Sequence, residues 1–219
     1  MNRPNYQKLL DKQIARLAQS RRVPTLLLHS CCAPCSSYVL EYLSQYFRIT
    51  VLYYNPNISP EEEYRARAAE QERLIREMPH VQAVTYLEGA YEPERFEEAA
   101  AGYEDAPEGG ARCARCFRLR LQEAVDCADR LGLDYFATTL TISPLKNAEM
   151  INQIGAEIAL GHRAEYLPSD FKKKNGFKRS IELSEEYGLY RQNYCGCRFS
   201  RGEAAKSLEK GLLASQTYK

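Results

Sequence analysis

The sequence predicts an α/β fold, a single domain in which helices flank a parallel sheet. Short apolar or β-branched runs alternate with longer segments whose apolar residues recur at helical spacing, and this alternation is typical of βαβ units. The chain has 219 residues, of which 44% are hydrophobic and 27% charged, an ordinary globular composition for one domain. Because we find no internal repeat or linker, we assign residues 1–219 to one domain.

Five strands are predicted, each from a short run with high β propensity. Residues 23–30 (VPTLLLHS) are almost continuously apolar, which is typical of a strand buried in a parallel sheet. Residues 48–54 (RITVLYY) are β-branched and aromatic. Three further runs complete the set, at 81–87, 135–141 and 163–167.

Helices are predicted between the strands from the spacing of apolar residues. The helix from Pro60 to about Glu77 has the clearest start, because Ser59 occupies the N-cap position and Glu62 closes a capping box three residues later. The expected helices, in order, are 6–20, 36–47, 60–77, 93–101, 112–131, 147–160, 180–187 and 200–210.

Seven of the eight cysteines fall into three tight groups, which are Cys31, Cys32 and Cys35; Cys113 and Cys116; and Cys195 and Cys197. The first group directly follows the first predicted strand, at the sheet edge where open α/β proteins bind ligands. The second group lies on one face at the start of a helix, whose N-terminus favours the thiolate form. In the third group the single intervening glycine permits an unusual turn that aims both sulfurs inward.

The cysteine pattern predicts metal or redox chemistry. Neither a signal peptide nor a transmembrane run is visible, so we expect a cytoplasmic protein without membrane contact, whose thiols stay reduced. A zinc site or a four-iron cluster takes four ligands, so seven thiols indicate two adjacent metal centres, or one cluster beside a redox-active dithiol. A structural zinc site and a thioredoxin-like pair are the simpler alternatives, but the pair leaves the second and third groups unexplained.

Three other side chains, those of Cys127, His29 and Asp170, are of types that can bind a metal. Cys127 lies eleven residues after Cys116 on the same predicted helix, about 16 Å along its axis, so we expect a buried core thiol. His29 is either a ligand or a hydrogen-bonded core histidine. Asp170 is either an oxygen ligand or the cap of a turn. The glycine-rich motifs that bind dinucleotides or nucleotide phosphates are absent from the sequence.

The electrostatic signal is local, because the formal net charge is only +1, and it begins with one basic segment. Its cations are Lys172, Lys173, Lys174, Lys178 and Arg179. Further arginines flank the second and third cysteine groups, so the pattern favours contact with an RNA backbone, although a solvated surface loop is the plainer alternative. The aromatic residues near these segments either stack on an RNA base or belong to the core; they are Tyr53, Tyr54, Phe177, Tyr190 and Tyr194.

Five strings together resemble the epoxyqueuosine reductase QueH family: 29–35 (HSCCAPC), 54–58 (YNPNI), 110–120 (GARCARCFRLR), 138–144 (TTLTISP) and 189–200 (LYRQNYCGCRFS). The resemblance runs from about Thr25 to about Arg201, which leaves residues 1–23 as an N-terminal helical extension. It implies a fold similar to the PP-loop (HUP) nucleotide-binding proteins. It also implies reduction of epoxyqueuosine to queuosine at the wobble position of tRNA, without cobalamin and with an unidentified electron donor.

The resemblance further implies a 4Fe-4S cluster and an adjacent mononuclear iron. The ligands would be Cys31, Cys32, Cys35, Cys113, Cys116, Cys195 and Cys197, with Asp170 as a possible carboxylate ligand. Two alternatives stay open. One is another iron–sulfur tRNA-modifying enzyme, such as an ATP-dependent sulfurtransferase, and the other is a structural zinc-binding adaptor. The proton donor and the division of thiols between the two centres are left unassigned.

Overall fold

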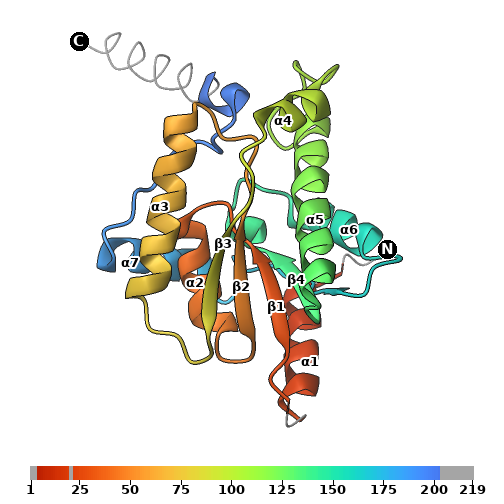
Figure 1. Ribbon diagram of the computed structural model, residues 1–219, viewed down its shortest axis with the longest axis vertical. Helices are drawn as coiled ribbons and strands as arrows, with labels where there is room; N and C mark the ends of the chain where they lie inside the picture. The colour runs from red at the N-terminus through yellow and green to blue at the C-terminus, as the bar shows by residue number, and fades with distance from the viewer. Residues whose placement is uncertain (1–3, 20–21, 203–219) are drawn as a thin grey trace, which may run out of the picture.

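A five-stranded parallel sheet forms the centre of the computed structural model, which describes residues 4–19 and 22–202 (Figure 1). The strands are β1 (Thr25–His29), β2 (Arg48–Tyr53), β3 (Val84–Glu88), β4 (Tyr135–Thr138) and β5 (Glu165–Tyr166). Their order in the sheet is β3-β2-β1-β4-β5, and β1 pairs in parallel with both β2 and β4. The predicted fold class is confirmed.

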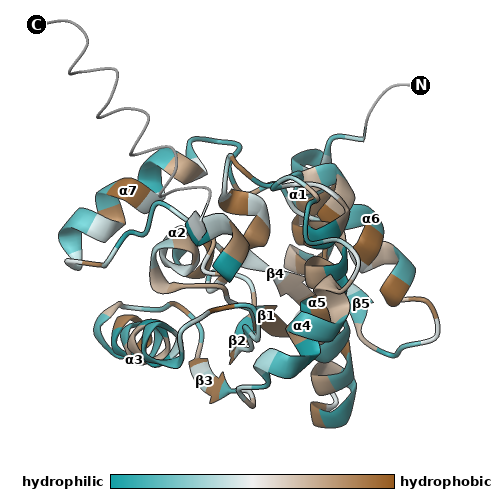
Figure 2. Cartoon of the chain, turned by 90° about the horizontal axis from the view of Figure 1, so that it is seen from above, coloured by the Kyte–Doolittle hydropathy of each residue, from teal (hydrophilic) through white to brown (hydrophobic). Residues whose placement is uncertain are grey.

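Helices cover both faces of this sheet. They are α1 (Tyr6–Ala18), α2 (Ala33–Leu43), α3 (Glu61–Glu77), α4 (Pro93–Ala100), α5 (Ala111–Leu131), α6 (Ala148–Ile158) and α7 (Gly176–Glu186), with a 3₁₀ turn η1 at Thr139–Ile142. Seen from above, α2, α3 and α7 lie on one side of the strands and α5 and α6 on the other (Figure 2). Among the described helices, none is long and apolar enough to cross a membrane.

Successive side chains of β1 point to opposite faces of the sheet, and each face carries one of two hydrophobic cores. Leu26 and Leu28 pack with residues of α1, α2 and α3 in one buried cluster, whereas Leu27 points the other way and packs with α5 and α6. Each fully buried leucine contributes about 1.5–3 kcal/mol of burial free energy. Leu10 and Ile14 of α1 belong to the first cluster, so the helix predicted as an N-terminal extension is packed against the core.

The sheet order creates a switch point at the carboxyl end of β1. The chain passes from β1 outward to β2 and β3, and then returns to the opposite side of β1 to form β4 and β5. The connections after β1 and β4 therefore diverge, and such a divergence opens a crevice at the carboxyl edge of the sheet. Cys31 follows β1 at this crevice and Thr139 follows β4.

The predicted starts of α2 and α7 are wrong by three and four residues, and that of α3 by one. α3 begins at Glu61 with Pro60 at its N-cap, and no side chain caps it, so the capping box of Ser59 does not form. The Ser59 backbone N–H instead donates to the carbonyl oxygen of Gly196 at 3.0 Å, a partner distant in sequence. α2 begins at Ala33, three residues before the predicted start, with Cys32 at its N-cap.

The predicted strand 135–141 is too long, because the Thr138 side chain accepts a hydrogen bond from the Leu140 backbone N–H and starts η1. The predicted loop 171–178 is also too long. α7 begins at Gly176, where a Cβ would lie 2.0 Å from the Phe171 carbonyl oxygen, so only glycine fits this close approach.

At the C-terminal end a helical turn starts at residue 198 and reaches residue 202. The remainder of the predicted helix 200–210, and position 20 of the predicted helix 6–20, lie outside the described residues.

Candidate metal centre

Cys31, Cys32 and Cys35, which we call the strand-end trio, converge where β1 meets α2. Their three sulfurs lie within 4.8 Å of one another, and those of Cys31 and Cys32 are 3.9 Å apart. The residues converge because Cys32 is the N-cap of α2 and Cys35 lies in its first turn. The free backbone N–H groups of a helix N-terminus favour negative charge at this position.

The trio is poised to carry a thiolate. Hydrogen bonds from Cys32 and Cys35, assisted by the Thr139 hydroxyl at 3.5 Å, hold the pKa of Cys31 well below its usual value. The same hydrogen bonding, together with burial, raises the pKa of Cys35. One sulfur of the trio is therefore the preferred anion, and a bound cation would draw the protons from the other two.

Cys113, Cys116, Cys195 and Cys197, which we call the quartet, line one small cavity together with Asn57 and Arg120. Cys113 and Cys116 lie in the first two turns of α5, and the Gly109 backbone N–H donates to the Cys113 sulfur at 3.2 Å. Burial raises the pKa of Cys113 and that of Cys116, the latter to about 12. Without a cation these thiols stay protonated at neutral pH, so the cavity is built for a group that displaces their protons.

The turn at Gly196 brings the two C-terminal thiols of the quartet into place. Its φ is +115°, a left-handed conformation that glycine adopts without strain, and a Cβ there would lie 3.0 Å from both Arg67 Nη1 and Ile58 Cγ1. Arg67 Nη1 donates to the carbonyl oxygen of Cys195 at 3.2 Å and fixes the turn from α3. The unusual turn expected from the sequence is confirmed.

The two thiol groups are neighbours. Cys195 lines the quartet cavity and also a larger open pocket that contains the whole trio. Thiols from β1–α2, from the start of α5 and from the Gly196 turn are therefore placed at one edge of the sheet. In Figure 1 the start of α5 and the last described residues lie at the same upper end of the molecule.

Two cations, Arg120 and Lys146, face these thiols. The sequence placed Arg120 among the arginines expected to meet an RNA backbone, but it is 1% exposed, and sequence reasoning assigned no role to Lys146. Burial by itself would lower the pKa of Arg120, but negative charge on the nearby sulfurs of Cys116 and Cys195 acts in the opposite direction and raises it. Lys146 lines the pocket of the trio; burial opposes its charge, yet negative charge on the nearby sulfurs, Cys195 first, raises its pKa. Lys146 follows η1 at the switch point, and no local motif marks it.

His29 and Cys127 belong to the interior. His29 is fully buried, its Nδ1 lies 2.9 Å from the Thr138 hydroxyl oxygen and its Nε2 lies 3.1 Å from the Tyr54 carbonyl oxygen, so both ring nitrogens are occupied. This favours the core histidine over the ligand. Cys127 is 1% exposed in the cluster between α5 and α6, and the prediction of a core thiol is confirmed.

Asp170 lies apart from the thiols. Its carboxylate is 2.6 Å from Lys172 Nζ, and it lines neither the quartet cavity nor the pocket of the trio. The structure therefore does not bring this predicted oxygen ligand together with the seven sulfurs.

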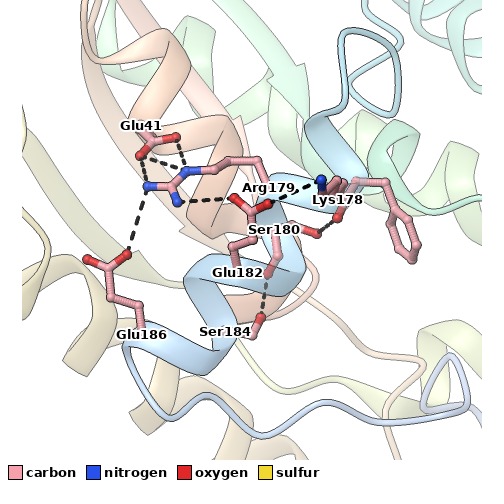
Figure 3. Close-up of polar contacts among 8 residues, drawn as sticks. Glu41, Lys178, Arg179, Ser180, Glu182, Ser184 and Glu186 are labelled. Carbon is pink, nitrogen blue, oxygen red and sulfur yellow. Dashed lines mark hydrogen bonds and ion pairs between the residues drawn. The ribbon is translucent and has the colours of Figure 1, made fainter.

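Most of the basic segment is paired with carboxylates. Arg179 binds Glu41 on α2 at 2.7 Å and also contacts Glu182 and Glu186, and Lys178 shares Glu182 (Figure 3). Lys174 pairs with Asp11 at 2.7 Å. Among the described residues no ion pair involves Lys173, which is exposed. A polyanion at this surface would meet less net positive charge than the sequence implies.

Known proteins match this chain over most of its length. Residues 26–203 match the family model described as epoxyqueuosine reductase QueH. A Staphylococcus epidermidis protein named epoxyqueuosine reductase QueH is 44% identical over 200 residues, which are 90% of this chain and 84% of that protein. Proteins of the same name from Streptococcus pyogenes and Thermotoga maritima are 45% and 34% identical, over 90% and 80% of this chain and 78% and 90% of their own lengths.

Proposed function

Since the chain belongs to the epoxyqueuosine reductase QueH family, we propose that it converts epoxyqueuosine to queuosine at the wobble position of tRNA with protein-bound iron and without cobalamin. This is the last step of queuosine biosynthesis. The observation that supports the metal assignment is that seven thiols line two neighbouring pockets at the carboxyl edge of the sheet. Cys195 lines both pockets.

The donor set fits two different centres. Within the described residues only the trio has ligand atoms all within 4.8 Å of one another. That spacing suits one ion, since metal–sulfur bonds of about 2.3 Å keep two sulfurs on one ion within about 4.6 Å. Three thiols leave a coordination position open for substrate. The quartet offers the four thiols that a 4Fe-4S cluster takes. We assign the single iron to the trio and the cluster to the quartet.

Removal of the epoxide oxygen consumes two electrons and two protons and yields an alkene and water. When bound, the cluster supplies electrons one at a time, and the single iron supplies a Lewis acid for the epoxide oxygen. The electrons come from a donor outside the chain. The reducing cytoplasm, where thiols stay free, suits this chemistry.

Lys146 supplies a positive charge in the pocket, beside the thiols. Its raised pKa keeps Nζ protonated at neutral pH, and its side chain lines the same pocket as the trio and Cys195. An ammonium in a partly buried pocket stabilises negative charge that develops on an oxygen and holds a proton for it. We assign both tasks to Lys146 Nζ.

Aromatic rings at the same pocket provide surfaces for a base. Phe177 and Tyr194 are half-buried and line it, with Arg191 5.8 Å from the centre of the first ring and Arg67 5.2 Å from that of the second. Enzymes that act on a base hold it outside the stack between such rings. Of the aromatic residues singled out in the sequence, these two form the proposed stacking surface for the wobble nucleotide.

We propose that the basic segment beside Phe177 contacts the tRNA backbone; its residues are Lys172, Lys173, Lys174, Lys178 and Arg179. Since Lys173 is exposed and, among the described residues, no carboxylate pairs with it and competes with phosphate, its replacement by Ala is expected to weaken tRNA binding and to reduce the salt slope of log K by about one. Filter binding across a salt series measures this. Arg130→Ala at the far end of α5 serves as the control, and equal slopes for the two variants would contradict the contact.

The function is tested on anaerobically purified protein by quantifying iron and sulfide and by assaying tRNA that carries epoxyqueuosine. We expect a brown protein that forms queuosine-containing tRNA when supplied with a low-potential reductant. A colourless protein loaded with zinc and inactive on this tRNA would support the adaptor instead. ATP binding with sulfur transfer to tRNA would support the sulfurtransferase.

A further inference from the structure

We propose that Asn57 and Arg120 are positioning residues that donate N–H···S hydrogen bonds to the metal centre held by the quartet and thereby raise its reduction potential. The inference rests on the proposed function, because it takes an iron–sulfur group to fill the quartet cavity. It assigns a role to two side chains that bind no metal themselves.

Asn57 is a buried amide whose polar atoms have no partner among the described residues. The residue is 2% exposed, and within 4–19 and 22–202 neither its side-chain oxygen nor its side-chain nitrogen finds a hydrogen-bond partner. It lines the quartet cavity together with the four thiols. Leaving a buried polar group unpaired is costly, so native proteins rarely keep one without a ligand or water beside it.

Arg120 is a second buried polar side chain at this cavity, and it carries a full positive charge. It is 1% exposed, its Nε donates to the Cys116 carbonyl oxygen at 3.3 Å, and its Nη1 lies 3.5 Å from the Asn55 side-chain oxygen. Its Nη2 is buried and has no hydrogen-bond partner in the part of the chain that the structure describes. Within the described residues no carboxylate forms an ion pair with Arg120. A buried guanidinium requires a countercharge, and the cavity that it lines offers the four sulfurs of the quartet, which become anionic when they bind a metal.

One turn, at residues 55–58, holds both donors in place. The Ile58 backbone N–H donates to the Asn55 carbonyl oxygen at 3.1 Å, and this turn places Asn57 at the cavity. The Asn55 side-chain nitrogen donates to the Ser30 carbonyl oxygen at 2.8 Å, while its side-chain oxygen faces Arg120. The turn is thus tied to the end of β1 and to α5 at once, and its amide and the guanidinium are held in fixed places.

Donors that point at metal-bound sulfur favour the reduced state. Reduction adds negative charge to the sulfurs, so a hydrogen bond or a buried cation stabilises the reduced form more than the oxidised one. One hydrogen bond to a charged group is worth about a factor of ten in an equilibrium constant. For a one-electron couple a factor of ten is about 59 mV.

Asn152 provides a matched comparison. It is also 2% exposed, but its nitrogen donates to the carbonyl oxygens of Ala148 and Ser169 and its oxygen accepts from the Ser169 backbone N–H and the Tyr166 hydroxyl. Asn152 therefore stabilises the fold through the protein alone, whereas Asn57 has its polar atoms free for a ligand.

The test replaces Asn57 with Leu and measures two quantities. In anaerobically loaded protein, a redox titration followed by electron paramagnetic resonance is expected to show a potential lower by about 59 mV, a tenfold shift in the reduction equilibrium. Arg120→Gln is expected to shift it in the same direction. In metal-free protein, the unfolding midpoint of Asn57→Leu is expected to stay level or rise, while that of Asn152→Leu falls.

An unchanged potential in Asn57→Leu at full iron content overturns the proposal, as does a metal-free midpoint that falls as far as that of Asn152→Leu. Loss of iron from Asn57→Leu with an unchanged metal-free midpoint supports it, because the amide then acts only on the loaded site. Failure of the proposed function gives a different result, since the unaltered protein would then hold no iron–sulfur group or would leave epoxyqueuosine in tRNA unreduced.

Discussion

Replacing Cys195 with Ala is expected to abolish turnover of epoxyqueuosine-containing tRNA and to lower the iron content. Cys195 is the one thiol that lines both the quartet cavity and the pocket of the trio, so its loss removes a ligand at the boundary of the two proposed centres. Cys113→Ala removes a quartet thiol from the start of α5 and is expected to have the same effect. Iron and sulfide analysis beside a single-turnover assay measures both variants.

Cys127→Ala is the control for these substitutions. Its thiol is buried in the apolar cluster between α5 and α6 and lines neither thiol cavity, so the variant is expected to keep its iron and its activity. Loss of one buried sulfur should cost stability of order 1 kcal/mol, seen as a lower unfolding midpoint. Full activity of Cys195→Ala, or loss of iron in Cys127→Ala, would overturn the assignment of ligands.

Replacing Lys146 with Met is expected to lower kcat by about 10²–10³-fold while leaving the iron content and the KM for tRNA close to those of the unaltered protein. Met has a similar length and removes only the ammonium, which faces the thiols of the trio and Cys195. Loss of that charge removes stabilisation of the oxygen as it leaves and removes the proton held at Nζ. Single-turnover rates at saturating reductant measure the step.

Lys146→Arg separates the charge of this side chain from its proton. Arg keeps the positive charge but does not give up a proton near neutral pH, so partial activity indicates electrostatic stabilisation, and activity as low as that of Lys146→Met indicates proton donation. If the kcat of Lys146→Met stays within threefold of the unaltered value at equal iron content, Lys146 has no part in the reaction.

Local signals in the sequence identified the segments that carry the thiols. The trio follows a continuously apolar strand, the next two cysteines start a helix, and Gly196 separates the last two; each of these positions can be recognised within about ten residues. The fold class follows from the same kind of signal, because alternating strands and helices leave few topologies other than a parallel sheet. The core role of Cys127 follows from helical geometry alone.

Contacts between residues far apart in the sequence set two features that local patterns do not predict, the cap of α3 and the pairing of Arg179. Ser59 has the sequence of a helix cap, but its amide bonds to Gly196, and Pro60 caps α3 instead. Arg179 belongs to a basic run, but Glu41 of α2 neutralises it. Neither partner lies near its residue along the chain, so a local pattern carries no information about either contact.

The sequence by itself determined the chemical character of this protein, a parallel α/β domain with seven thiols in three groups on segments suited to metal or redox chemistry. Only the tertiary structure decided how those sulfurs are divided, and that Asn57, Arg120 and Lys146 face them. The physical reason is that ligand type and backbone conformation are set by neighbours in the chain. Burial, countercharge and the distance between sulfurs depend on how β1, β4 and the Gly196 turn meet in space.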